Sequence, residues 1–301
     1  VQTCALPIYV FDTLAEIASG TDDKMAAMAI MVLGDVYSYM DDDLKKANAT
    51  EAALQRVLVL LEKAEGARAS KLAKAAAIIA PLRGDPASMI RVVDGHKDDY
   101  VRTSAYKNMM TYGRLAVFDA VKGMSAKGPK MVTIATLEAP LNMYKSSAEE
   151  KAVYCPWAKG FLGNADHEIV AKAGMVMNRC AGEYIDAWLD EAEKRHKAGE
   201  LKDTTLLFSV REMCMALMSG VTPVAGAEKQ CERNYAFLET VAKDEAVPGK
   251  VRGSALWNIY YQRRDQKSLD LMRKYENHKV PEIREQAKDA IKSLTTTYKL
   301  K

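Results

Sequence analysis

The stretch Val251-Arg252-Gly253-Ser254-Ala255 opens with an apolar residue, continues with arginine and places a small residue fifth. The same order of residue types recurs at three other places, once with cysteine as the small residue: Val101-Arg102-x-x-Ala105, Val210-Arg211-x-x-Cys214 and Ile283-Arg284-x-x-Ala287. A weaker copy without the arginine is Ile169-Val170-x-x-Ala173. We interpret the apolar residue as filling a seam between helices and the small residue as letting the next repeat approach closely. The arginine is expected to bind a neighbouring loop or an acidic residue.

The spacing of these copies predicts an array of repeated units. Ile169 precedes Val210 by 41 residues, and Val210 precedes Val251 by 41 again. A period near 40 residues is typical of stacked helix pairs. Apolar residues also recur at three- and four-residue spacing in nearly every segment, which indicates amphipathic helices. The breaks between these segments are short, so the pattern predicts a single domain over residues 9–301.

The composition favours helices and a folded chain. Of the 301 residues, 49% are apolar and 28% are charged, which is typical of a folded protein and not of a disordered one. Glycine (17), proline (9) and aromatic residues (7%) are too sparse for a strand-rich fold with many turns. No apolar run reaches the roughly 18 residues that a membrane span needs. The longest, Met25 to Gly34, is interpreted as a buried helix.

The motif and its period together resemble the HEAT-repeat family. The resemblance extends from about residue 9 to residue 301 and rests on loosely matching copies joined by the repeated interval. It implies an all-α fold, a right-handed α-α superhelix (an alpha solenoid of the armadillo type) of about seven helix pairs. The family's fold holds partners and does not itself imply a reaction. We therefore expect a non-catalytic scaffold that binds an unknown protein or peptide along its concave face.

The first eight residues differ from the rest of the chain. Residues 1–8 have no helical period, contain both cysteine and proline, and resemble translated sequencing-adapter sequence. We expect them to be a non-native tail and the true N-terminus to be missing, so that a signal peptide would not be visible.

The charges are unevenly distributed and suggest a second function. Residues 12–65 carry 11 acidic and 5 basic side chains, whereas residues 250–301 carry 13 basic and 6 acidic ones. The simpler interpretation is solvated helix faces of uneven sign. The alternative is a HEAT-like protein that binds nucleic acid through its basic C-terminal third. Trp157, Trp188 and Trp257 suggest a further alternative, a HEAT-like DNA glycosylase. This alternative is disfavoured because the basic residues are spread over many helices and do not line one face.

No pattern of catalytic, cofactor-binding or metal-binding residues emerges. The four histidines, at 96, 167, 196 and 278, are scattered, and no CxxC or HxxxH spacing supports a metal site made of His167 with Cys155 and Cys180. The segment Gly123 to Gly128 lacks the lysine and hydroxyl residue of a phosphate-binding loop. We expect no enzyme activity, no cofactor and no metal.

The cysteines suggest the compartment. Apart from Cys4 there are four, which allow three pairings. Cys214 and Cys231 are equidistant from a turn near Thr222, so in an antiparallel hairpin they would lie at the same height. Cys155 and Cys180 flank a turn less symmetrically. Two local disulfides would place the protein in an oxidising compartment such as a bacterial periplasm, and four ordinary buried thiols are the alternative.

Overall fold

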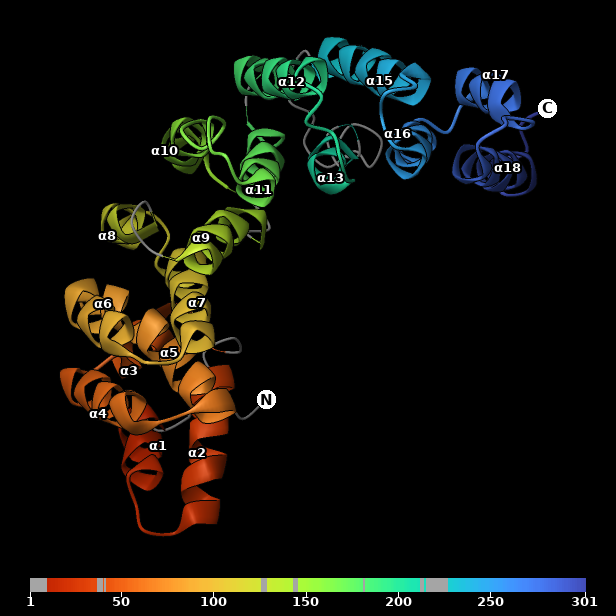
Figure 1. Cartoon of the computed structure of the whole chain (residues 1–301). Helices are drawn as coiled ribbons and strands as arrows, with labels where there is room; N and C mark the ends of the chain where they lie inside the picture. Colours follow the sequence, from red (N-terminus) through yellow and green to blue (C-terminus); the bar gives the residue numbers. More distant parts are fainter. Residues whose placement is uncertain are drawn as a thin grey trace. The chain divides into compact units, whose positions relative to one another are not determined.

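A computed structural model gives the fold of the chain (Figure 1) and describes residues 10–36, 40, 42–125, 129–142, 146–180, 182–211, 214 and 227–301. Over these residues it contains seventeen α-helices, one five-residue π-helical turn at Met109–Gly113, and no strand. The prediction of an all-α fold is confirmed. The expected tail at residues 1–8 lies outside the described residues.

The chain divides into two compact units, Val1–Ser146 and Ser147–Lys301. Repeats in a stacked array contact only their neighbours. A division into units is therefore compatible with one array, and the single domain over residues 9–301 stays a prediction.

Unit 1 is built from two rows of helices. Its helices are α1 (Val10–Ala18), α2 (Asp23–Val36), α3 (Asp42–Asn48), α4 (Glu51–Lys63), α5 (Gly66–Leu82), α6 (Pro86–Gly95), α7 (Asp99–Asn108), α8 (Leu115–Ser125) and α9 (Lys130–Asn142). Along one row α1, α4, α6 and α8 pack in order, and along the other α2, α5, α7 and α9 do so. We call these the first and second helices of unit 1.

Unit 2 repeats the arrangement. Its helices are α10 (Ala148–Lys159), α11 (His167–Met177), α12 (Gly182–Lys197), α13 (Thr205–Arg211), α15 (Ala227–Lys243), α16 (Gly249–Gln262), α17 (Gln266–Tyr275) and α18 (Pro281–Thr296). The first helices are α10, α12, α15 and α17. The second helices α11, α13, α16 and α18 pack in order against one another (Figure 1).

Acidic side chains cap the N-termini of several of these helices. Asp22 accepts a hydrogen bond from the backbone N–H of Lys24 at the start of α2, at 2.9 Å. Asp98 caps α7 through the N–H of Tyr100 at 2.8 Å, and Asp166 caps α11. Each carboxylate satisfies a backbone donor that the first helical turn leaves free, and it also faces the positive end of the helix dipole.

Four of the five small residues of the motif are buried on second helices, and the fifth, Cys214, is buried just after α13. Ala105, Ala173, Ala255 and Ala287 are fully buried in α7, α11, α16 and α18. The apolar residue of each of these copies is also buried and is the third residue of its helix: Val101, Ile169, Val251 and Ile283. The seam between α16 and α18 is tight, because a Cβ on Gly253 would lie 2.8 Å from the backbone oxygen of Glu282.

The copy at Val210 does not share this position. Val210 is buried, but it is the sixth residue of α13, whose third residue is the buried Leu207. The copy at Val210 therefore lies later in its helix than the other copies, and the two 41-residue intervals do not join equivalent positions. A buried valine followed by arginine also fits the later turns of a helix. The side chain of Arg211 lies outside the described residues.

The motif arginines contact backbone oxygens at helix ends in two cases. Arg252 is buried, and its Nε donates to the backbone oxygen of Ala242, near the end of α15, at 2.9 Å. Arg284 donates to the backbone oxygen of His278, in the turn after α17, at 3.2 Å. Arg102 instead forms an ion pair with Asp99 of its own helix. Arg252 and Arg284 thus contact backbone oxygens near helix ends, whereas Arg102 contacts a carboxylate of its own helix.

Replacing Ala255 with leucine is expected to destabilise unit 2 by about 1–3 kcal/mol, because the added methyl groups have no space in a closely packed seam. The matched control is Ala236→Leu on the exposed face of α15 in the same unit. Urea unfolding of both variants measures the difference. Equal stabilities would show that the seam accommodates a larger side chain.

Candidate functional site

Both expected disulfides are present, and both lie in unit 2. Cys155 of α10 is bonded to Cys180, which follows α11, with 6.0 Å between the Cα atoms. Cys214, just after α13, is bonded to Cys231 of α15, with 5.7 Å between the Cα atoms. All four cysteines are buried. The turn expected near Thr222 lies outside the described residues.

A network of buried amides surrounds the second disulfide. Gln262 of α16 and Asn234 of α15 are fully buried. The Gln262 Oε1 accepts hydrogen bonds from the backbone N–H of Cys214 at 3.1 Å and from Asn234 Nδ2 at 3.2 Å. Asn234 Nδ2 also lies 3.2 Å from the backbone oxygen of Val210, which accepts from it. Buried amides that lose a partner are costly, so these contacts fix the chain around Cys214 against α15 and α16.

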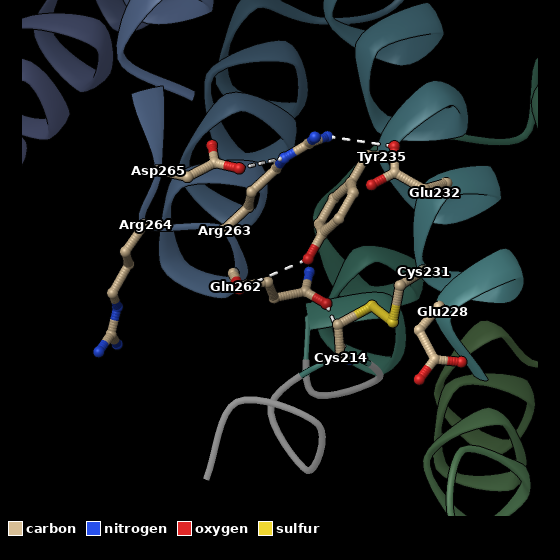
Figure 2. Close-up of a pocket in the computed structure, with 9 residues that line it drawn as sticks. All are labelled: Cys214, Glu228, Cys231, Glu232, Tyr235, Gln262, Arg263, Arg264 and Asp265. Carbon is tan, nitrogen blue, oxygen red and sulfur yellow. Dashed lines mark hydrogen bonds and ion pairs between the residues drawn. A yellow bond between two sulfur atoms is a disulfide. The ribbon is translucent and has the colours of Figure 1, made fainter. Parts of the chain in front are cut away.

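A pocket of about 400 Å³ opens beside this disulfide (Figure 2). Among the described residues, three segments line it: Cys214 after α13, the first turns of α15, and the turn between α16 and α17. The lining residues are Cys214, Glu228, Cys231, Glu232, Tyr235, Gln262, Arg263, Arg264 and Asp265. Its volume lies within the range of small-ligand sites, roughly 300–1,000 Å³.

One wall of the pocket is held rigidly by Arg263. Its Nε lies 3.0 Å from Asp265 Oδ2, and its Nη1 lies 3.4 Å from Glu232 Oε2. The guanidinium also lies over the ring of Tyr235, 4.9 Å from the ring centre. The Tyr235 hydroxyl donates to the backbone oxygen of Gln262 at 3.4 Å, and burial raises the pKa of Tyr235 to about 12. The tyrosine is therefore neutral, and Arg263 is already paired.

The second helices carry most of the exposed large apolar side chains. Nine such side chains are exposed among the described residues, and eight of them lie on second helices. These eight are Met25, Met28, Met31 and Val32 on α2, Leu82 on α5, Tyr100 on α7, Met131 on α9 and Phe208 on α13. The ninth is Val59 on α4. A second, smaller pocket of about 220 Å³ is lined by Met31, Val32, Asp35 and Val36.

The interpretation of Met25 to Gly34 as a buried helix is wrong for one face of α2. Ala26, Ala29, Ile30 and Leu33 are buried, but Met28 is 65% exposed. Apolar residues occupy both faces, so periodicity alone does not distinguish the inner face from the outer one. None of the helices in the described part of the chain combines the length and apolar character needed to cross a bilayer.

The histidine and tryptophan side chains take part in internal contacts. His167 lies 3.4 Å from Glu200, and His196 lies 2.8 Å from Asp244. Cys155 and Cys180 are bonded to each other, which excludes them as thiolate ligands beside His167. Trp188 is fully buried. Trp157 and Trp257 form edge contacts with Phe161 and Tyr260 respectively.

Several side chains of the basic C-terminal third are engaged within unit 2. Arg252 and Arg284 donate to backbone oxygens, and Arg263 is paired with two carboxylates. Two further ion pairs join Arg273 to Asp270 and Lys279 to Glu245. The formal charge of this segment therefore overstates the number of cations that are free to bind phosphate.

The comparisons with known proteins show no relationship that bears on function. No protein-family model matches the sequence, and no curated protein matches it. Among solved structures, the chain is similar to an engineered protein determined by a structural genomics consortium, at 15% identity. The match covers 95% of this chain and 98% of that one, with a TM-score of 0.29, which is too low to support an argument about fold or function.

Proposed function

We propose that this protein is a non-catalytic scaffold that binds another protein along its second helices, as the resemblance to HEAT repeats implies. The observation that carries the proposal is the distribution of exposed apolar side chains, eight of nine on second helices. Exposed apolar side chains grouped on one helix, as the four on α2 are, are typical of protein-binding sites. The four on α2 include three methionines, which adapt their shape to different partners.

The two disulfides support an extracytoplasmic location for this binding. Structural disulfides form and persist in oxidising compartments and are rare in the cytosol. Both disulfides are buried, and each joins two segments that are neighbours along the chain. These are properties of structural disulfides. A periplasm or cell surface is the location that we infer.

Site-specific photo-crosslinking in cells tests the proposal. A photoreactive phenylalanine analogue is placed at Met28 or Tyr100 on second helices, and at Val59 on a first helix as a control of similar exposure. We expect Met28 and Tyr100 to yield adducts to the same protein and Val59 to yield few. Met28→Glu should then weaken binding of that protein about tenfold, or roughly 1.4 kcal/mol. Equal adducts at all three positions would contradict the assignment of the surface.

Nucleic-acid binding through residues 250–301 stays a prediction. Salt dependence separates it from protein binding, because each phosphate contact makes affinity fall with rising salt. A logarithmic slope near zero for any observed DNA binding would count against it.

A further inference from the structure

Arg264 differs from its neighbour Arg263 in having no ionic partner among the described residues. Its guanidinium contacts two aromatic rings, with Cζ 5.4 Å from the centre of Tyr261 and 5.2 Å from that of Tyr298. Its Nε is buried without a hydrogen-bond partner. Figure 2 shows that the side chain extends away from Arg263 and Asp265 at the edge of the pocket.

Contact with the two tyrosine rings orients the Arg264 guanidinium without neutralising it. Cation–π contacts leave the N–H groups at the edge of the group free to donate. A planar guanidinium with free edge donors matches a carboxylate, which it binds through two parallel hydrogen bonds. Because its rotamer is already restricted, Arg264 would lose little conformational entropy on binding.

The α15 side of the pocket has the opposite charge. Glu228 is exposed and forms no ion pair in the described part of the chain, while Glu232 is 63% exposed and is paired with Arg263. In Figure 2, Glu228 and Arg264 stand on different sides, with the disulfide and Gln262 between them. The pocket therefore has one acidic edge, one basic edge and a largely uncharged floor.

We propose that this pocket binds a short peptide segment of a partner protein that carries both an acidic and a basic side chain. Arg264 binds the carboxylate, Glu228 binds the cation, and the peptide backbone between them crosses the floor formed by the disulfide. The proposal rests on the proposed function, since its ligand is part of a protein, but it uses a different surface from the exposed residues of the second helices. A polyanion fits less well, because its phosphates would meet Glu228.

Binding of end-blocked pentapeptides to the full-length, disulfide-bonded protein tests this assignment. Each fluorescent peptide carries lysine and glutamate two, three or four positions apart in an alanine and glycine background. Companion peptides replace the glutamate, the lysine or both with glutamine. We expect at least one mixed-charge peptide to bind ten times more tightly than its three companions, as measured by fluorescence anisotropy.

Variants of Arg264 and Glu228 identify which edge of the pocket binds the acidic side chain of the peptide and which binds the basic one. Arg264→Gln should abolish the preference for glutamate over glutamine in the peptide and leave the preference for lysine. Glu228→Gln should do the reverse, and Arg264→Lys should retain part of the first preference. Arg273→Gln is the matched control, because Arg273 is an exposed arginine that is paired with Asp270 outside the pocket. Circular dichroism of each variant checks that the helices remain.

Three results would overturn the proposal. The first is equal binding of all four peptides at every spacing, and the second is an unchanged glutamate preference in Arg264→Gln. The third is binding of single-stranded DNA that depends on Arg264, without peptide binding. If the peptides bind and the Met28 and Tyr100 crosslinks fail, only the proposed second-helix surface is wrong. If the crosslinks succeed and the peptides do not bind, only the pocket assignment is wrong.

Discussion

Reduction of both disulfides is expected to lower the thermal midpoint of unit 2 by roughly 12 to 24 °C. The bonds join residues 25 and 17 positions apart, and the chain-entropy estimate for loops of these sizes is about 3 kcal/mol each. A domain of this size shifts by roughly 2–4 °C for each kcal/mol. Differential scanning calorimetry of oxidised and reduced protein measures the shift.

Unit 1 supplies an internal control for this experiment, because its one cysteine is Cys4. Hydrogen exchange should show lost protection in residues 147–301 and little change in residues 10–142. Replacing one pair at a time with alanine separates the two bonds and avoids the buried hydroxyl that serine would introduce. Four titratable thiols besides Cys4, in protein prepared from its native compartment, would contradict both the disulfides and the inferred location.

Replacing Trp188 with alanine is expected to cost about 3–5 kcal/mol of unfolding free energy. Trp188 is fully buried in α12, and its ring lies directly on α11, because a Cβ on Gly174 would be 2.6 Å from Cε2 of the ring. The substitution leaves a cavity beside the backbone of Gly174, and backbone atoms cannot easily move to fill it. Urea unfolding followed by circular dichroism measures the loss.

The half-buried Trp257 provides the comparison, and Trp257→Ala should cost clearly less. Trp188→Phe should also cost less than the alanine variant. It keeps most of the ring volume and removes an indole N–H that is buried without a partner. A Trp188→Ala protein as stable as Trp257→Ala would show that the helices close over the cavity.

Features that depend on local sequence were predictable, and those that depend on distant contacts were not. The buried alanines of the motif follow from the helical period, since a small residue recurs at a fixed distance from a buried one. The pair Cys214 and Cys231 follows from equal distances to a turn. The position of Val210 late in α13 could not be predicted, because the motif does not specify which turn of a helix it occupies.

Arg195 illustrates what the sequence could not reveal. It is buried in α12 and donates to the backbone oxygens of Leu162 and Asn164, more than 30 residues earlier, at 2.9 Å. An arginine in a charged helical segment normally indicates a solvated face. The pocket beside Cys231 was missed for the same reason, because Tyr235 and Arg263 meet only once α15 and α16 have packed.

The disulfides also limit how far the chain extends under a pulling force. When the ends of an intact protein are pulled apart, the segments between bonded cysteines cannot lengthen. The two bonds enclose 25 and 17 residue intervals, and an extended chain spans at most about 3.3–3.6 Å per residue. The oxidised chain is therefore shorter at full extension by roughly 140 Å. If its ends were tethered to different structures, all of this difference would fall within unit 2, and unit 1 would be the more extensible half.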